Sequence, residues 1–481
     1  MSALSPASSV DSIKSIFRLL STTVETLIDD RDRTRGESAH HHVTHGSTGA
    51  TSRTQDDAVK VIRAAMGSLE SLIIDPHDFL LDLFMSYLRS RTLHIVAEKN
   101  IAATLAQAGP EGLCSSELAR ISGIQAGKLR TVPGLTQLDD HFANNHISQV
   151  LADDLEFRAL IVTRGQIQYA ASDFLPTALS TSPDHDGDRS SPNAFQMAAR
   201  TKLSFFEWLH QRLPEHDIDW RFPTPQQYDQ LYMETCHEYK SSSELVMPRP
   251  EKSLFNVAMG GLGRAQDRSC IEDYPWIDLS DEATIVDVGG GIGTFCMQLH
   301  CTHPNLKVIV QDKAPVIEQA ASVWKERYPK AVSQGTAKLM THDFFQKSPV
   351  SGAEIYWLRH ILHDWDDVDA VPILSSIRDS MTSNSVVLIA EILMTTTLAS
   401  DKIRAAPQPL LANYGCAMNT AHAMDLNMMA MTEGKERSPE EYERIVQAAG
   451  LKVVKIWDCR GLLSIIECRL NSWAHRDRTY E

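Results

Sequence analysis

From residue 284 onward, short β-branched apolar segments alternate with helical ones, and this alternation constrains the fold more than any other feature. The segments TIVDVGG, KVIVQD, AKLMTHDF, AEIYWLRH and VVLIAEIL each have the length of a buried strand, and helical stretches such as APVIEQAASVWKERY separate them. Strands joined by helices run parallel, and helices then cover both faces of the sheet. The sequence therefore predicts an α/β domain with an open parallel sheet, to which KVVKIWD and LLSIIECRL add a terminal strand pair.

Each of the first five segments carries a polar residue at or near its carboxyl end, namely Asp287, Asp312, Asp343, Arg359 and Glu391. Ligands of open α/β sheets bind in the crevice beyond the carboxyl ends of the strands. Polar residues also mark where strands stop, but that explanation is weaker for five strands with such mixed residue types. We expect a binding site at this edge of the sheet.

The turn after the first predicted strand, DVGGGIGTF, is rich in glycine, which lets a backbone approach a ligand closely. The dinucleotide fingerprint G-x-G-x-x-G fails here, because its last glycine is absent in either register. A nicotinamide dehydrogenase is therefore a poor alternative. The pattern that remains, at Gly289, Gly291 and Gly293, suits a nucleoside without a pyrophosphate, such as S-adenosylmethionine (SAM). Asp312 ends the next strand, where a carboxylate can accept hydrogen bonds from ribose hydroxyls.

Charge and hydropathy restrict the partners of this chain. Its net charge is −16 at pH 7, which gives no electrostatic reason to bind nucleic acid. No apolar run approaches the roughly 20 residues that cross a bilayer, and the N-terminus lacks the pattern of a signal peptide. The eight cysteines form no CxxC pair, which is typical of reduced thiols. The sequence predicts a cytoplasmic protein with a small-molecule substrate, no nucleic acid and no membrane.

We expect three regions along the chain. Residues 1–56 comprise a helix over about 10–30 and a flexible segment rich in His and Ser, whose histidines are better explained by a solvated loop than by a metal site. Residues 57–270 are mainly helical and include an apolar stretch, DFLLDLFMSYLRSRTLHIVAEKNIAATLA, that suits a core or a subunit interface. Residues 271–481 hold the predicted sheet.

Within the second region, GPEGLCSSELARISGIQAGKL predicts two short helices joined by a tight turn, which is typical of a winged-helix module. Such modules often bind DNA, but the acidic charge and the lack of a Lys/Arg-rich second helix favour a scaffold or dimerisation role. Pro133-Gly134 would break any long helix that follows, so we expect a trimmed module.

Together, DVGGGIG, Asp312, HDFF and LRHILHDW with ERS downstream resemble the SAM-dependent O-methyltransferases of the plant caffeate/flavonoid type. The likeness is closest to the fungal members that methylate phenols in secondary metabolism. It extends from about residue 57 and is strongest from 273 to 468. It implies a C-terminal Rossmann-like SAM-binding domain, a mainly helical, winged-helix-like dimerisation domain before it, and a homodimer.

The resemblance also implies roles for single residues. Gly289, Gly290 and Gly291 would lie against the methionine and ribose of SAM, Asp312 would hold the ribose hydroxyls, Asp343 and Phe344 would contact the adenine, and Arg359, where many members have lysine, would touch the cofactor. His363 would be the catalytic base, flanked by Glu391 and Glu436. The stretch from 394 to 423 looks longer than in plant members, so the acceptor cannot be transferred by analogy.

The chemistry agrees with a histidine base. A phenol, with a pKa near ~10, is mostly neutral at pH 7, and a histidine with a pKa near ~6.5 can accept its proton when a carboxylate orients the imidazole. Catechol methyltransferases of another family use a hard cation instead, but Asp366 and Asp367 are better explained as acidic residues at a helix start. We therefore expect no metal. The alternative is a non-catalytic SAM-binding regulatory protein on the same scaffold.

The neighbours of His363 leave some roles open. We expect Asp364 to bond local backbone in the turn, a common role for aspartate. His360 is expected to be structural or to form a second wall of the pocket. Trp365 either walls the cofactor or fills the core, and the sequence favours neither.

Overall fold

The computed structural model describes residues 6–40, 52–131, 135–138, 140–181, 191–214 and 247–471. Its contacts divide the chain into two compact units. We call residues 1–79, 266–428 and 434–481 the sheet unit, and residues 80–265 and 429–433 the helical unit. The division differs from the three expected regions mainly in grouping residues 1–79 with the sheet, and those expected boundaries stay a prediction.

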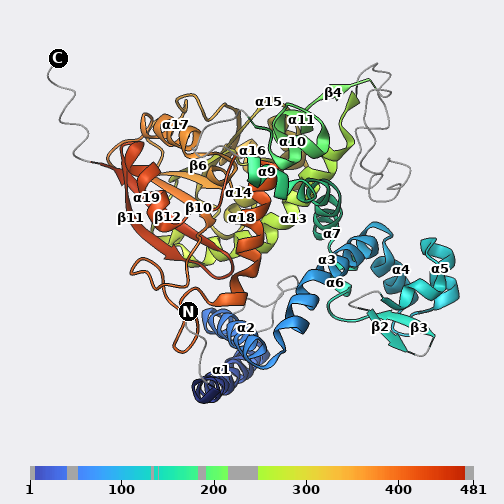
Figure 1. The fold of residues 1–481 in the computed structure, drawn as a ribbon. Coiled ribbons are helices and arrows are strands. Elements are labelled where there is room, and N and C mark those ends of the chain that lie inside the picture. The colour runs from blue at the N-terminus through green and yellow to red at the C-terminus, as the bar shows by residue number, and fades with distance from the viewer. Residues whose placement is uncertain are drawn as a thin grey trace. The chain divides into compact units, whose positions relative to one another are not determined.

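The sheet unit contains a seven-stranded sheet in the order β11-β12-β10-β9-β6-β7-β8 (Figure 1). Neighbouring strands from β10 to β8 pair in parallel, whereas β12 pairs antiparallel with both β10 and β11. The strands are β6 (Thr284–Val288), β7 (Lys307–Asp312), β8 (Ala337–Thr341), β9 (Ile355–Arg359), β10 (Val386–Ile392), β11 (Leu451–Asp458) and β12 (Leu463–Leu470). The predicted α/β fold class is confirmed, and each predicted strand segment forms a strand.

Helices cover both faces of this sheet (Figure 1). Successive residues of a strand point to opposite faces, so Ile285 and Trp357 enter one buried cluster while Val286 and Tyr356 enter the other. In the first cluster the rings of Phe295 and Trp357 stack at 4.3 Å. The helices are α14 (Thr294–Thr302), α15 (Ala314–Arg327), α16 (Pro329–Gln334), α17 (Asp367–Arg378), α18 (Asn419–Met431) and α19 (Pro439–Ala448), with short 3₁₀ turns η6 (Trp276–Asp278), η7 (Leu362–Asp364) and η8 (Gly415–Met418).

Two N-terminal helices, α1 (Pro6–His40) and α2 (Arg53–Ile73), belong to the sheet unit. The expectation of a flexible segment over residues 31–56 is wrong for residues 31–40 and 53–56, because α1 continues to His40 and α2 begins at Arg53; residues 41–51 lie outside the described part. Asp30 of α1 accepts hydrogen bonds from Ser52 Oγ and Gln55 Nε2 at the start of α2, which joins the two helices.

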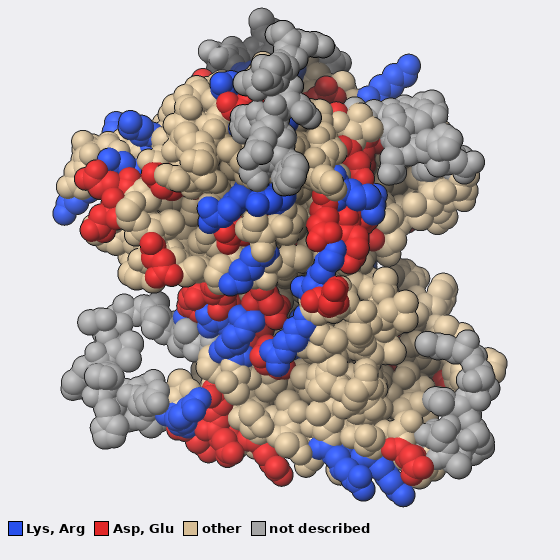
Figure 2. Space-filling model, turned by 90° about the vertical axis from the view of Figure 1, so that its left-hand side faces the viewer, with Lys and Arg blue, Asp and Glu red and all other residues tan. Residues whose placement is uncertain are grey.

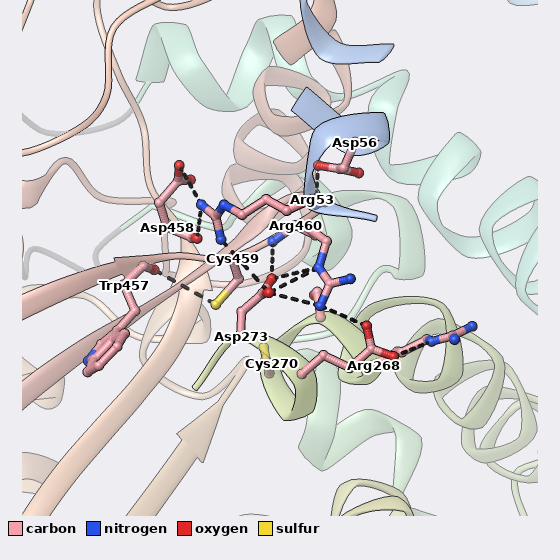
Figure 3. A network of polar contacts seen from close by, with 12 residues as sticks. Arg53, Asp56, Arg268, Cys270, Asp273, Trp457, Asp458, Cys459 and Arg460 are labelled. Atoms are coloured by element: carbon pink, nitrogen blue, oxygen red, sulfur yellow. Dashed lines mark hydrogen bonds and ion pairs between the residues drawn. The ribbon is translucent and has the colours of Figure 1, made fainter. Parts of the chain in front are cut away.

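The start of α2 is tied to the sheet by charge. Arg53 bonds the backbone carbonyl and the carboxylate of Asp458 at the end of β11, and Asp56 accepts a hydrogen bond from the backbone N–H of Gly461 (Figure 3). Asp273, at the end of helix α13 (Pro250–Asp273), binds Arg460 of the same β11–β12 turn. These contacts explain why α2 belongs to the sheet unit.

The helical unit holds the expected winged-helix-like module. It consists of α4 (Ile101–Ala108), β1 (Leu113–Cys114), α5 (Ser115–Ser122), the 3₁₀ helix η1 (Ala126–Thr131), β2 (Leu135–Leu138) and β3 (His141–Asn144), with the sheet order β1-β3-β2. Gly123 ends α5 in the left-handed conformation, with φ of 71°. We expected the module to lack a longer helix after residue 129. The described residues there form the short 3₁₀ helix η1 and then β2, and Pro133-Gly134 lies outside the described residues.

The remaining elements of the helical unit are mostly short helices. They are α3 (Pro76–Glu98), which begins in the sheet unit, α6 (Gln149–Asp153), α7 (Leu155–Thr163), the π-helical η2 (Arg164–Gln168), α8 (Tyr169–Ser172), α9 (Leu175–Thr181), α10 (Ala194–Ala199), α11 (Phe205–Leu209), the strands β4 (Arg212–Leu213) and β5 (Met247–Pro248), and most of α13. Phe195, Phe205 and Trp208 form the aromatic centre of one of its cores.

Side chains of both charges alternate over the face drawn in Figure 2. Among the described residues, no helix combines the length and the apolar character that a bilayer span requires. The cytoplasmic location expected from the sequence stays a prediction.

Candidate active site

Backbone conformation and close packing explain the glycines of the turn after β6. Gly289 and Gly291 have φ of 69° and 60°, which side-chain-bearing residues rarely adopt. A Cβ at Gly290 would lie 2.5 Å from the carboxylate carbon of Asp287. A Cβ at Gly291 would meet nothing within 4 Å, so this residue borders open space. The turn thus presents bare backbone to open space at Gly291.

Asp312, at the end of β7, lies beside this turn. Its carboxylate accepts hydrogen bonds from the backbone N–H of Gly291 at 2.9 Å and of Lys313 at 2.7 Å. The structure therefore brings together two of the residues expected around the ribose.

Phe344 follows β8 and reaches the same turn, because its ring is 3.5 Å from the position a Cβ would take on Gly289. The neighbouring Asp343 is exposed and accepts a hydrogen bond from the backbone N–H of Phe345. Trp365 packs edge-on against Phe344 and Phe345, with ring centroids 5.9 and 4.9 Å apart. It is thus part of the core cluster beside the crevice.

Arg359, the last residue of β9, makes polar contacts with two other side chains. Its Nη1 forms an ion pair with Asp267 of α13, and its Nη2 lies 3.5 Å from Thr294 Oγ1 at the start of α14. Sequence reasoning missed Asp267, which is separated from Arg359 by 92 residues.

His363 lies in η7, just beyond β9, with only 5% of its surface exposed. Its Nδ1 is 2.8 Å from Glu436 Oε1 and 3.5 Å from Glu391 Oε2. The structure therefore brings the three expected catalytic residues together. Nε2 faces away from these glutamates and lies 3.9 Å from Asp364 Oδ1.

Glu391, fully buried on β10, also fixes the backbone of the histidine turn. Its Oε1 accepts hydrogen bonds from the N–H groups of Ile361 and Leu362, both at 3.0 Å, and of His363 at 3.4 Å. One carboxylate oxygen thus holds the turn, and the other faces the imidazole.

Known proteins resemble this chain over most of its length. The family model of the O-methyltransferase domain matches residues 225–452. The chain is 38% identical to O-methyltransferase gedA of Aspergillus terreus over 425 residues, covering 85% of this chain and 86% of the relative. It is 36% identical to O-methyltransferase tpcA of Aspergillus fumigatus over 442 residues, covering 87% and 88%. The chain belongs to the O-methyltransferase family.

Solved structures agree on the fold of this methyltransferase. The mitomycin 7-O-methyltransferase MmcR matches with a TM-score of 0.59 and 23% identity, covering 85% of this chain and 99% of its own. Human N-acetylserotonin methyltransferase in complex with SAM matches with a TM-score of 0.58 and 19% identity, covering 83% and 99%. The cofactor of this family is SAM.

The buried carboxylates of this methyltransferase change the basicity of His363. Burial by itself lowers the pKa of His363, but Glu391, Asp364 and Glu436 outweigh it and raise the pKa to about 10. Burial raises the pKa of Glu391 to about 7. The cluster therefore holds a proton more tightly than an isolated histidine does.

Arg437 is a second residue that sequence reasoning missed, although the motif ERS contains it. This fully buried guanidinium donates to the carbonyls of Leu362 at 2.7 Å and Trp365 at 2.6 Å, and to Asp367 at 2.8 Å. Gly434 brings its backbone so close to the carbonyl of His363 that a Cβ there would lie 1.8 Å from the oxygen. The segment that carries Glu436 thus also clamps the histidine turn.

The other residues of the histidine turn have separate roles. Asp366 caps α17 by accepting a hydrogen bond from Asp369 N–H, and Asp367 lies in the first turn, as expected. The expected bond from Asp364 to local backbone is not seen among the described residues; its carboxylate lies near His363 instead. His360 has φ of 54°, and its Nε2 is 2.6 Å from Gln266 Oε1.

One set of potential metal ligands lies in this cluster. Ligand atoms of His360, His363 and Glu391 come within 4.8 Å of one another in the described part of the chain. The hydrogen bond to Glu436 accounts for the position of His363 without an ion. Metal-free catalysis stays a prediction.

Proposed function

We propose that this methyltransferase methylates a phenolic hydroxyl of a small aromatic secondary metabolite, with His363 as the general base. The observation that carries the proposal is the 2.8 Å contact from His363 Nδ1 to Glu436 Oε1, with Nε2 on the opposite side of the ring. In the neutral imidazole, which gains population as the pH rises towards the raised pKa of His363, a carboxylate on Nδ1 keeps the proton on that nitrogen and leaves the Nε2 lone pair free to accept one.

In the reaction, the S–CH₃ bond of the SAM sulfonium breaks as an O–CH₃ bond forms, and S-adenosylhomocysteine leaves. His363 Nε2 accepts the proton of the phenol, and Glu391 and Glu436 stabilise the resulting imidazolium. The raised pKa of His363 approaches that of a phenol, about 10, so the proton transfer is nearly balanced in energy.

The proposed cofactor site uses residues that fit a nucleoside. Gly289, Gly290 and Gly291 offer close backbone approach, and the Gly291 side borders open space. Asp312 has its carboxylate directly beside that loop. Phe344 supplies an apolar surface for the adenine, with Asp343 as a hydrogen-bonding partner, and Arg359 lies at the loop through Thr294.

The test of the base is His363→Gln, assayed with a panel of phenols by formation of S-adenosylhomocysteine. Turnover should fall by about 10²- to 10⁴-fold, the usual contribution of a general base, while SAM binding measured by calorimetry is retained. A variant with wild-type turnover would exclude His363 as the base. Assays in excess EDTA test the metal: full loss of activity that magnesium restores would contradict metal-free catalysis.

A non-catalytic regulatory protein remains the alternative, but no contact favours it. The three side chains His363, Glu391 and Glu436 are buried together at considerable desolvation cost, which binding SAM alone does not require. Wild-type enzyme that binds SAM but methylates no phenol of a broad panel would support this alternative.

We also propose a homodimer through α3. Along this helix, Leu80, Leu81, Leu83 and Phe84 are between 60% and 69% exposed, and Met85, Tyr87 and Leu88 are also exposed. An apolar surface of this extent is expensive in water and marks an interaction site. A second copy of the chain suits it, because an isologous interface pairs the same apolar patch with itself.

A further inference from the structure

A buried ion pair stands between α13 and the carboxyl end of β9. The side chain of Asp267 is fully buried, and that of Arg359 is 15% exposed. One oxygen of Asp267 receives Arg359 Nη1, and the other accepts a hydrogen bond from Gln298 Nε2 at 2.9 Å. Both oxygens of this carboxylate are therefore in use, and its orientation is fixed.

The pair lies against the glycine-rich turn. The second guanidinium nitrogen of Arg359 is 3.5 Å from Thr294 Oγ1, and Thr294 begins α14 directly after that turn. A guanidinium donates through a planar fork, so Arg359 can bind Asp267 with one arm and face the turn with the other. A lysine has a single ammonium and could not divide its contacts in the same way.

The charge of Arg359 also acts on a second carboxyl group. Burial raises the pKa of Asp267 to about 6 and that of Asp287 to about 7, and Arg359 opposes both shifts. A guanidinium stays charged at any pH the enzyme meets. Asp267 is the carboxylate in direct contact with it, so this residue compensates most of the charge of Arg359.

Compensation matters because the two forms of the cofactor differ in charge. SAM has a sulfonium, an ammonium and a carboxylate, with a net charge of +1, whereas S-adenosylhomocysteine has lost the sulfonium charge and is neutral overall. An uncompensated guanidinium beside the site would repel SAM more than its product. An enzyme with that defect would bind SAM more weakly relative to S-adenosylhomocysteine than the wild type does.

We propose that Asp267 is a positioning residue that sets the charge selectivity of the cofactor site, by orienting and neutralising Arg359 so that cationic SAM is accepted. The inference rests on the proposed cofactor site at Gly289–Gly291. It predicts a change in the ratio of the two affinities, which a residue that only stabilises the fold would not alter.

The experiment is calorimetric titration of the full chain with SAM and, separately, with S-adenosylhomocysteine. In Asp267→Asn, the Kd for SAM should rise about tenfold or more, the size expected for one unit charge about 12 Å away at an effective dielectric constant of about 20, while the Kd for S-adenosylhomocysteine changes by less than about threefold. Equal weakening of both ligands, or no change in either, would overturn the proposal.

Asp273→Asn is the matched control. Asp273 lies on the same helix, has a side chain that is 8% exposed, and pairs with Arg460 at 2.9 Å (Figure 3). It should lower the melting temperature and leave the ratio of the two Kd values at the wild-type level. A ratio that shifts as far as in Asp267→Asn would show a general effect of loosening α13 and would overturn the proposal.

A second variant covers the case in which Asp267→Asn does not fold. The double variant Asp267→Asn/Arg359→Gln removes both charges and should keep the wild-type ratio of the SAM affinity to the S-adenosylhomocysteine affinity. A SAM affinity that falls about tenfold relative to that for S-adenosylhomocysteine would contradict the charge argument. The titrations need no acceptor. Failure to methylate phenols would therefore refute the proposed function and leave this inference intact, and a wild-type enzyme that binds neither ligand would refute the inference.

Discussion

His363 Nδ1 and Glu436 Oε1 lie 2.8 Å apart, although 73 residues separate them in the chain. Glu436 is 3% exposed and His363 5%, so the contact is shielded from water and its electrostatic effect is large. The contact orients the imidazole and increases its basicity at the same time. The increased basicity of His363 should be visible in the pH dependence of activity.

Replacing Glu436 with Gln should move the pH profile of kcat/KM to lower pH. Removing one negative charge destabilises the imidazolium, so the pKa of His363 falls, and the activity that appears as the histidine loses its proton then appears at lower pH. The same phenol is used for both enzymes, so its own ionisation cancels in the comparison. A rising limb that stays in place, or moves to higher pH, would contradict the assignment of His363 and Glu436 as a pair.

Arg437→Met should lower the free energy of unfolding by about 3 kcal/mol, because it leaves Asp367 and two buried carbonyls without their donor. Urea titration followed by tryptophan fluorescence measures the change. Arg378→Met is the control: Arg378 also donates to a carbonyl, that of Ala449, but its side chain is 27% exposed, so we expect a loss of about 1 kcal/mol or less. Equal losses of unfolding free energy in the two variants would show that the buried contacts of Arg437 stabilise the fold no more than those of Arg378.

Gly291→Ala should weaken SAM binding, whereas Gly335→Ala should not. Both glycines have positive φ and nothing within 4 Å of an added Cβ, so the backbone strain is similar, about 1 kcal/mol. The difference is the place: the space beside Gly291 is the proposed cofactor site, and Gly335 ends α16. Calorimetry with SAM checks the pair. Similar affinities for both variants would mean that the open space at Gly291 is not where the cofactor binds.

Phe84→Glu should convert a dimer to a monomer, as measured by light scattering after gel filtration. The charge is placed on an apolar helix surface, and burying it in a self-paired interface is costly. Leu398→Glu serves as the control, since Leu398 is even more exposed, at 78%, but lies far from α3 in the sequence, on a loop of the sheet unit. A wild-type enzyme that is already monomeric would refute the proposed dimer.

The sequence by itself determined the features that depend on near neighbours. The alternation of strand and helix segments predicts the seven strands, because burial of both sheet faces requires continuous apolar runs. The glycines of DVGGGIG and the cap at Asp366 are also local, since a positive φ or a helix start depends on a few adjacent residues. His363, Glu391 and Glu436 were expected together only through resemblance to a family.

Tertiary structure alone decided the contacts between distant segments. The pairing of Arg359 with Asp267 and the clamp of Arg437 on the histidine turn join residues 92 and 75 positions apart, and no periodicity links them. The joining of α1 to α2 is similar, because Asp30 accepts hydrogen bonds from Ser52 and Gln55, which lie 22 and 25 positions further along the chain. From the sequence we can infer only that a polar side chain needs a hydrogen-bonding partner if it is buried. The packing of the whole chain determines which residue that partner is.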